Sequence, residues 1–220
     1  MHRKKNLAER SVCCILGLCM AILLGSTFSS WAQDLPGDPY ERGLVLLKKF
    51  RYEEAKACFD QVISRDAKNL NAYYYRGRAL VALNQLDAAL SDFDHTLKID
   101  PNFAPGYVGK AQVAVVRKDF TLAMDNIARA QSLDPANAEA FYQKGIVYGY
   151  QNNINGAIEA LNKCIEVQPD HAYAHYQLGL AYNQLKRMDL VVTHLEKFLM
   201  LAPEAPEAEQ VRRLLSSLRG

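Results

Sequence analysis

The strongest constraint on the fold of this chain is a repeat of 34 residues. A small residue recurs at this interval at Gly43, Gly77, Ala111, Gly145 and Gly179. A second small or branched residue recurs at Ala55, Ala89, Ala123, Ala157 and Val191, and a large apolar residue at Phe59, Phe93, Ile127, Leu161 and Leu195. The five copies keep one register without an insertion. The sequence therefore predicts a stack of similar units, each of which packs on the next.

Each copy has the pattern of two amphipathic helices joined by a short turn. In the copy that begins at Leu70, Tyr73, Gly77 and Leu80 recur at helical spacing. A glycine inside a helix costs about 1 kcal/mol relative to alanine. Its recurrence at four of five equivalent positions therefore predicts that a neighbouring helix approaches closely at this point.

The residues at the joint and after the second helix predict where the helices begin and end. The joint positions hold Glu53, Asp87, Thr121, Asn155 and Asp189, and because four of these five are good N-caps, we expect this position to cap the second helices. Proline disfavours helical geometry at the residue before it, so we expect second helices to end before Pro101, Pro135, Pro169 and Pro203.

This pattern resembles the tetratricopeptide repeat, a helix–turn–helix unit of 34 residues with small, aromatic and proline residues at set offsets. The resemblance covers residues 36–203 and implies an all-α fold, a right-handed α-solenoid of five units within 39–203. It also implies that the first helix of each unit lines the concave wall. In 204–220, the apolar positions Val211, Leu214, Leu215 and Leu218 predict a helix that caps the last repeat.

The N-terminus has the layout of a secretory signal peptide over residues 1–32, followed by a linker, 33–38. A basic stretch precedes an apolar run from Val12 to Leu24, and small residues lead to Ala32, after which we expect cleavage. The run has 13 residues, fewer than the roughly 20 that span a bilayer. The alternative is an uncleaved anchor in the inner membrane with its positive end in the cytoplasm.

Composition narrows the function of the mature chain. After residues 1–32 are removed, 22 basic and 23 acidic residues remain, a balance that offers no electrostatic footprint for nucleic acid. Cys58 and Cys164 lie three repeats apart, too far for a disulfide. No catalytic or phosphate-binding motif stands out. We therefore expect neither an enzyme nor a resident cofactor.

The candidate binding residues lie on the concave wall that the resemblance implies, at the second, fifth, sixth, ninth and thirteenth positions of each repeat. Eleven of the twelve tyrosines fall in expected first helices, and tyrosine suits peptide recognition because it offers an apolar ring and a hydroxyl. We predict that these residues bind a partner segment: Tyr40, Asn71, Tyr74, Tyr75, Arg78, Gln112, Tyr142, Gln143, Tyr150, Tyr173, Tyr176 and Gln177. The alternative is that the fifth-position tyrosines (Tyr40, Tyr74, Tyr142 and Tyr176) only support neighbouring helices.

Two charged or metal-ligating patterns compete with this interpretation. The row Arg42, Arg76, Lys110 and Lys144 is suited to an anionic ligand, but we expect these side chains to cover apolar surface and to reach acids such as Asp60 and Asp94. His171 and His175 are four residues apart, a spacing that can bind a metal in an enzyme accessory protein.

Together these features predict a non-catalytic scaffold that binds protein or peptide partners outside the cytoplasm. In a Gram-negative bacterium that compartment is the periplasm, where such a protein would assist the assembly of an envelope complex. The alternatives are a membrane-anchored adaptor whose groove faces outward and a metal-binding accessory protein.

Overall fold

The computed structural model describes residues 37–219. The chain divides into the units Met1–Asp38 and Pro39–Gly220, and the second of these carries the repeats. The predicted signal sequence, 1–32, lies outside the described residues.

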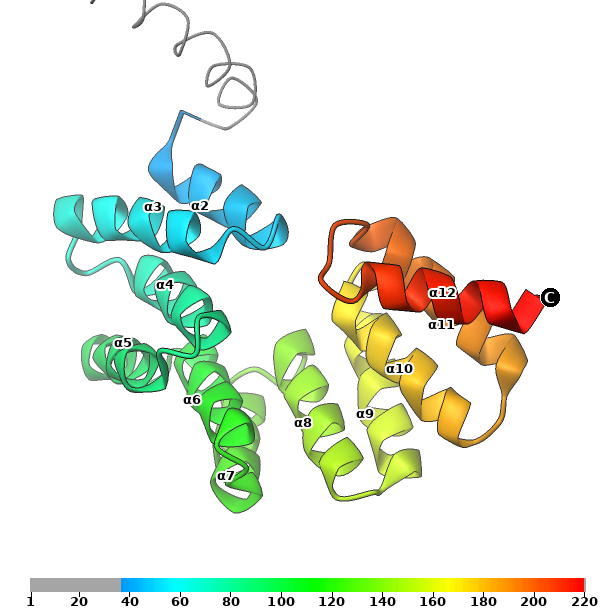
Figure 1. Ribbon diagram of the computed structural model, residues 1–220. Helices are drawn as coiled ribbons and strands as arrows, with labels where there is room; N and C mark the ends of the chain where they lie inside the picture. The colour runs from blue at the N-terminus through cyan, green and yellow to red at the C-terminus, as the bar shows by residue number, and fades with distance from the viewer. Residues whose placement is uncertain (1–36, 220) are drawn as a thin grey trace, which may run out of the picture. The chain divides into compact units, whose positions relative to one another are not determined.

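All regular structure within residues 37–219 is helical, as predicted (Figure 1). The first helices of the five pairs are α2 (Pro39–Lys48), α4 (Leu70–Ala82), α6 (Ala104–Val116), α8 (Ala138–Tyr150) and α10 (Ala172–Gln184). The second helices are α3 (Tyr52–Arg65), α5 (Leu86–Ile99), α7 (Phe120–Leu133), α9 (Ile154–Val167) and α11 (Met188–Leu201). A last helix, α12 (Ala208–Arg219), packs on α11.

The repeated small residues face the repeated large ones, which forms the core of each pair. A Cβ atom on Gly77 would lie 2.5 Å from Cε1 of Phe93, and a Cβ atom on Gly109 would lie 2.4 Å from the same atom. The Phe93 ring is therefore held between α4 and α6. The five large residues of this position (Phe59, Phe93, Ile127, Leu161 and Leu195) are at most 1% exposed. The predicted close approach is confirmed, and the approaching group is a large side chain.

The turns inside the pairs differ from the prediction. The second residue after the end of each first helix has a left-handed backbone conformation, with φ between 56° and 61°. These residues are Phe50, Asn84, Lys118, Asn152 and Lys186. At the second pair, Gln85 N donates to Leu80 O at 2.8 Å and Asn84 N to Val81 O at 2.9 Å, which closes the end of α4.

Because this turn reverses the chain within few residues, the second helices begin one residue before the expected capping residues, and two residues before the starts that those caps predicted. The prediction that Glu53, Asp87, Thr121, Asn155 and Asp189 cap the second helices is wrong, because all five lie inside the first turn of a helix. The caps that bond through a side chain are Asp119, which accepts from Leu122 N, and Asn153, which accepts from Gly156 N. The predicted ends before the prolines are confirmed, since α5, α7, α9 and α11 each stop two residues before one.

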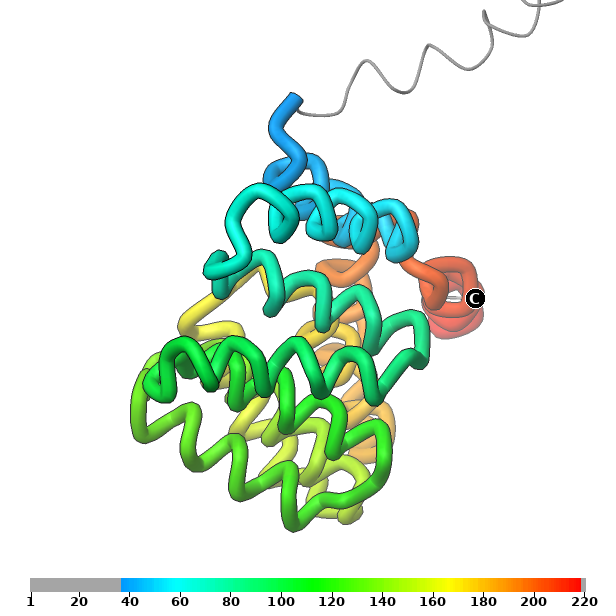
Figure 2. The backbone as a smooth tube through the Cα atoms, turned by 90° about the vertical axis from the view of Figure 1, so that its left-hand side faces the viewer, coloured from blue at the N-terminus to red at the C-terminus, as the bar shows by residue number. Residues whose placement is uncertain are grey.

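The stack curves toward its first helices. Each first helix contacts the next, as in α4 with α6 and α6 with α8, whereas successive second helices have no Cα atoms within 8 Å of one another in the described repeats. The first helices therefore form the inner, concave layer, as the resemblance implied. Figure 2 shows the pairs in succession from the side, from cyan through green to orange.

The C-terminal helix covers the apolar end of the stack. Val211 and Leu215 are buried in one cluster with Leu195 and Phe198 of α11. The helix begins at Ala208, later than the predicted 204, and Leu218 is 38% exposed. None of the helices within 37–219 has the length and hydrophobicity that a bilayer span requires.

Candidate functional site: the concave face

The centre of the concave face holds an ion pair that bridges two non-adjacent repeats. Arg78 on α4 belongs to the second repeat and Glu139 on α8 to the fourth, and Arg78 Nη2 lies 3.9 Å from Glu139 Oε2. Gln143 Nε2 donates to Glu139 Oε1 at 2.9 Å. We call Tyr74, Arg78, Glu139, Tyr142, Gln143 and His171 the central cluster.

His171 completes this cluster and caps a helix at the same time. Its Nδ1 accepts a hydrogen bond from Ala174 N at 3.0 Å, so the neutral ring carries its proton on Nε2. That nitrogen lies 3.3 Å from Glu139 Oε2 and donates to it. The His171 ring also lies against Tyr142, with centroids 4.7 Å apart.

The surroundings keep Glu139 ionised. Burial raises the pKa of this carboxyl, but the charge of Arg78 and the hydrogen bonds from His171 and Gln143 outweigh burial and lower the pKa to about 2. Glu139 therefore remains a fixed acceptor that orients the side chains around it.

The tyrosines of the central cluster remain neutral hydroxyls. Burial raises the pKa of Tyr74, and burial together with the Glu139 charge raises the pKa of Tyr142. Tyr74 is only 7% exposed and packs among Tyr75, Phe93 and Phe103. It supports the neighbouring helices, whereas Tyr142 is half-buried.

A second aromatic group lies at the N-terminal end of the same face. Tyr40 and Tyr75 meet edge to face with centroids 6.0 Å apart, and Tyr75 stacks on Phe59 at 5.8 Å. Both tyrosines are half-buried. Burial and the neighbouring Tyr75 raise the pKa of Tyr40 to about 12, so its hydroxyl stays protonated.

A third aromatic group lies at the C-terminal end. Tyr173 and Tyr176 pack on Phe198, with centroids 5.7 Å and 5.0 Å away. Tyr173 Oη donates to Glu207 Oε2 at 2.9 Å. Phe50 of the first repeat reaches this group, and its ring centroid lies 6.3 Å from that of Tyr173.

The other predicted residues lie outside these groups. Tyr150 is 60% exposed and stacks on Phe120 at the far end of α8. Asn71 is exposed, and Gln112 and Gln177 are half-buried. Among the described residues, no hydrogen bond connects these three amides to the central cluster.

Sequence reasoning missed several residues that shape this face. Glu139 is the second residue of its repeat, which is one of the wall positions, so the repeat pattern could have identified it. Phe50, Tyr52 and Glu207 lie outside the wall positions and approach through the curvature of the stack, which the repeat period does not specify.

Two residues of the basic row form ion pairs with acids of the second helices, and a third, Lys144, lies over the ring of Tyr148. Arg76 binds Asp92 at 2.6 Å and Asp60 at 2.7 Å, and Lys110 binds Asp94 at 2.7 Å. The predicted pairing with Asp60 and Asp94 is confirmed.

His171 and His175 do not converge on a common point. His175 Nε2 donates to Pro169 O at 3.1 Å, and its Nδ1 lies 3.0 Å from Nδ1 of His194. The partners of His171 are Glu139 and Ala174. Within residues 37–219, no group of three His, Cys, Asp or Glu side chains is placed to hold a metal ion. The geometry therefore gives no support to the metal-binding alternative.

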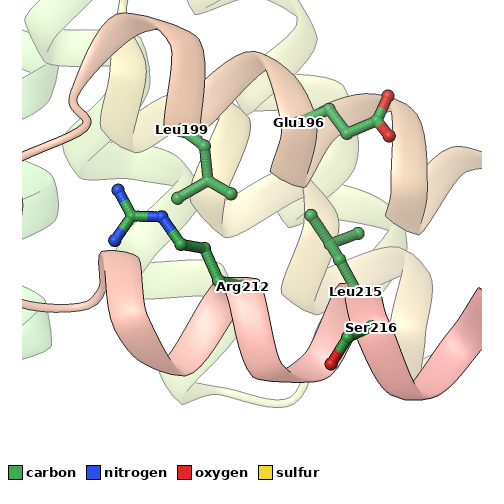
Figure 3. A pocket seen from close by; sticks show the side chains of 5 residues that line it. All are labelled: Glu196, Leu199, Arg212, Leu215 and Ser216. Atoms are coloured by element: carbon green, nitrogen blue, oxygen red, sulfur yellow. The ribbon is translucent and has the colours of Figure 1, made fainter.

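Two small pockets lie away from the concave tyrosines. One, of about 290 Å³, lies between α11 and α12 and is lined by Glu196, Leu199, Arg212, Leu215 and Ser216 (Figure 3). The other, of about 330 Å³, is lined by residues of α9, α10 and α11 and the α9–α10 connection, among them His175 and His194. No residue of the predicted groove lines either pocket.

Stacked helix pairs of this kind define an α-helical repeat solenoid, and matches to family models identify the type of repeat. Models described as tetratricopeptide repeat match residues 40–104 and 172–204, and one described as TPR repeat matches 147–186. The chain belongs to the tetratricopeptide repeat family, whose members bind protein or peptide partners, and its matches point to a non-enzymatic repeat protein.

The first of three solved structures to which the chain is similar supports this fold. TTC0263, a thermophilic TPR protein of Thermus thermophilus, is 20% identical with a TM-score of 0.67, over 81% of this chain and 96% of its own. YrrB, a TPR protein with an unusual peptide-binding site, is 22% identical with a TM-score of 0.48, over 80% and 90%. MamA from Desulfovibrio magneticus RS-1 is 25% identical with a TM-score of 0.45, over 74% and 90%. The comparison with curated proteins found no match.

Proposed function

We propose that this protein is an exported scaffold whose concave face binds a segment of a partner protein and so assists the assembly of an envelope complex. The observation that carries the proposal is the environment of Arg78. Its side chain is 37% exposed, and its nearest acid, Glu139, lies 3.9 Å away, which is beyond hydrogen-bonding distance. A guanidinium has five N–H donors, so Arg78 retains the capacity to bind a partner.

The composition of the face favours a peptide segment without a large net charge. The central cluster pairs the charge of Arg78 with that of the ionised Glu139, so it presents no single-sign field. The buried Tyr74 and the half-buried Tyr142 belong to the same cluster, and Gln112 and Gln177 supply amides on neighbouring first helices. Tyrosine rings pack on apolar side chains, while hydroxyls and amides bind main-chain groups of an extended or helical segment.

The test compares two arginines of the same helix. Twelve-residue peptides are selected from a random phage-displayed library on the purified chain, and the Kd of the selected peptides is measured by fluorescence anisotropy. Arg78→Gln is expected to weaken binding about tenfold or more, because a charge-assisted hydrogen bond contributes about 1.5–3 kcal/mol. Arg76→Gln is the matched control, since Arg76 is also ion-paired but faces Asp60 and Asp92.

Equal losses in the two variants, or no loss in either, would contradict binding at the concave face. Thermal melting of each variant separates a loss of binding from a loss of folding. A library that yields no binding peptide would count against peptide recognition altogether.

The compartment is part of the same proposal and rests on the sequence of residues 1–32. Intact mass spectrometry of the protein from its native cells is expected to give an N-terminus at Gln33. A full-length protein in the membrane fraction would favour the anchored adaptor instead.

A further inference from the structure

The turn of the first repeat carries an aromatic side chain where the other repeats carry a polar one. Phe50 has a left-handed backbone with φ of 58°. The residues at the four equivalent turns are Asn84, Lys118, Asn152 and Lys186, and all four are exposed. A bulky residue is unusual in this conformation, which asparagine tolerates better. Because Phe50 is half-buried in this conformation, we expect its ring to pack against another part of the molecule.

That partner lies in the last repeat. Phe50 packs against the cluster formed by α11, the α11–α12 loop and α12, and its ring meets the edge of Tyr173. Tyr52 begins α3 beside Phe50, with centroids 6.3 Å apart, and its pKa is raised by burial and by the charge of Glu207. Figures 1 and 2 both show the α2–α3 turn next to the segment that leads into α12.

The helices of the first repeat do not approach those of the last repeat at the level of the backbone. No Cα atom of α2 or α3 lies within 8 Å of one in α10, α11 or α12. Each repeat is stabilised by its neighbours along the stack, so separation of the first repeat from the last would leave every helix pair intact. The contact can therefore open without unfolding a repeat.

The contact also lies across the concave face. Tyr173 is the second residue of the fifth repeat, which is a wall position, and its hydroxyl donates a hydrogen bond to Glu207 Oε2 at 2.9 Å. Arg78 of the central cluster is close enough to influence the Tyr52 hydroxyl electrostatically. A peptide segment that contacts the Tyr173 ring must therefore compete with the Phe50 ring, which lies against it.

We propose that Phe50, Tyr52, Tyr173 and Glu207 form a clasp that holds the first repeat against the last, and that a partner segment binds the concave face in competition with this clasp. The competition rests on the proposed function, whereas the clasp itself does not. Opening of the clasp widens the concave face and exposes Tyr173.

The test replaces the aromatic residue with the one found at equivalent turns. Phe50→Asn keeps a residue suited to the left-handed turn, as at Asn84 and Asn152, and removes the ring from Tyr173. Hydrogen exchange of residues 202–207 is expected to accelerate about tenfold or more, because local opening then requires fewer contacts to break. The radius of gyration from small-angle X-ray scattering is expected to increase. Lys118→Asn, at an exposed equivalent turn, is the matched control and should change neither quantity.

The same variants are then titrated with the library-selected peptide, and Phe50→Asn is expected to bind it several-fold more tightly. Unchanged exchange and radius in Phe50→Asn would overturn the clasp, whatever the peptide does. A changed radius with unchanged peptide affinity would overturn the competition. If exchange accelerates but no peptide binds any variant, the clasp stands and the proposed function fails. Tyr173→Phe, which keeps the ring and removes the bond to Glu207, provides a milder second variant and should accelerate exchange in 202–207 to a smaller extent.

Discussion

The substitution Gly77→Ala tests the contact on which the repeat depends. A methyl group at this position would lie 2.5 Å from Cε1 and 2.7 Å from Cζ of Phe93. The ring cannot move away, because Gly109 of α6 leaves equally little space on its other side. One of the helices must therefore shift.

The expected magnitude is a balance of two effects. Overpacking of a filled core costs about 1–3 kcal/mol. Alanine in place of glycine gains about 1 kcal/mol of helix propensity. We therefore expect the free energy of unfolding to fall by about 1 kcal/mol, with a decrease in Tm of about 2–4 °C for a chain of this size.

The assay is thermal or urea unfolding of a double-mutant cycle. The third repeat already pairs Ala111 with Ile127, which are buried in one cluster. Phe93→Ile should therefore relieve the overpacking of Gly77→Ala, with a coupling energy of at least about 0.5 kcal/mol. Gly149→Ala is the control for propensity, because no atom lies within 4 Å of its added methyl, and it should stabilise the protein.

Two outcomes would refute this reasoning. Stabilisation by Gly77→Ala as large as that by Gly149→Ala would show that the Phe93 ring has room to move. Additivity of Gly77→Ala and Phe93→Ile within about 0.3 kcal/mol would show that the two side chains are not coupled.

Two further predictions concern histidine and tyrosine. Burial and the neighbouring His175 lower the pKa of His194 to about 4, so the unfolded chain binds more protons than the folded one below about pH 6.5. The free energy of unfolding is therefore expected to fall as the pH decreases from about 6.5 toward 4, by no more than about 3 kcal/mol after solvent screening. Urea unfolding of His194→Phe should show a smaller decline. Tyr74→Ala should lower the free energy of unfolding by about 3 kcal/mol because Tyr74 is a core residue, whereas Tyr142→Ala, at a half-buried residue, should lower it less. Equal melting of the two variants would contradict their different burial.

The repeat period predicted the fold because it records local packing. Gly77 and Phe93 belong to one helix pair, so the contact between them follows from spacing alone. The starts of the second helices were predicted two residues too late because the turns depend on a left-handed residue. Asn84 is typical of that conformation, but Phe50 gives no such signal.

The concave face could be predicted only in part. The wall positions identified Arg78 and Tyr142, since the position of a residue on its own helix follows from the repeat. The pairing of Arg78 with Glu139 depends on how sharply the stack curves, which is the sum of small rotations between repeats. The spacing of residues within one repeat therefore does not predict this pairing.

The third repeat explains why the second and fourth can meet. At repeat positions five and six, which belong to the concave wall, the third repeat has Val108 and Gly109, where the second repeat has Tyr74 and Tyr75. Both residues of α6 are buried, and the Phe93 ring occupies the space over Gly109. At these two positions α6 places no aromatic ring between α4 and α8, which leaves room for Arg78 to approach Glu139. The small residues of the middle repeat therefore favour the approach of the second and fourth repeats on which the central cluster depends.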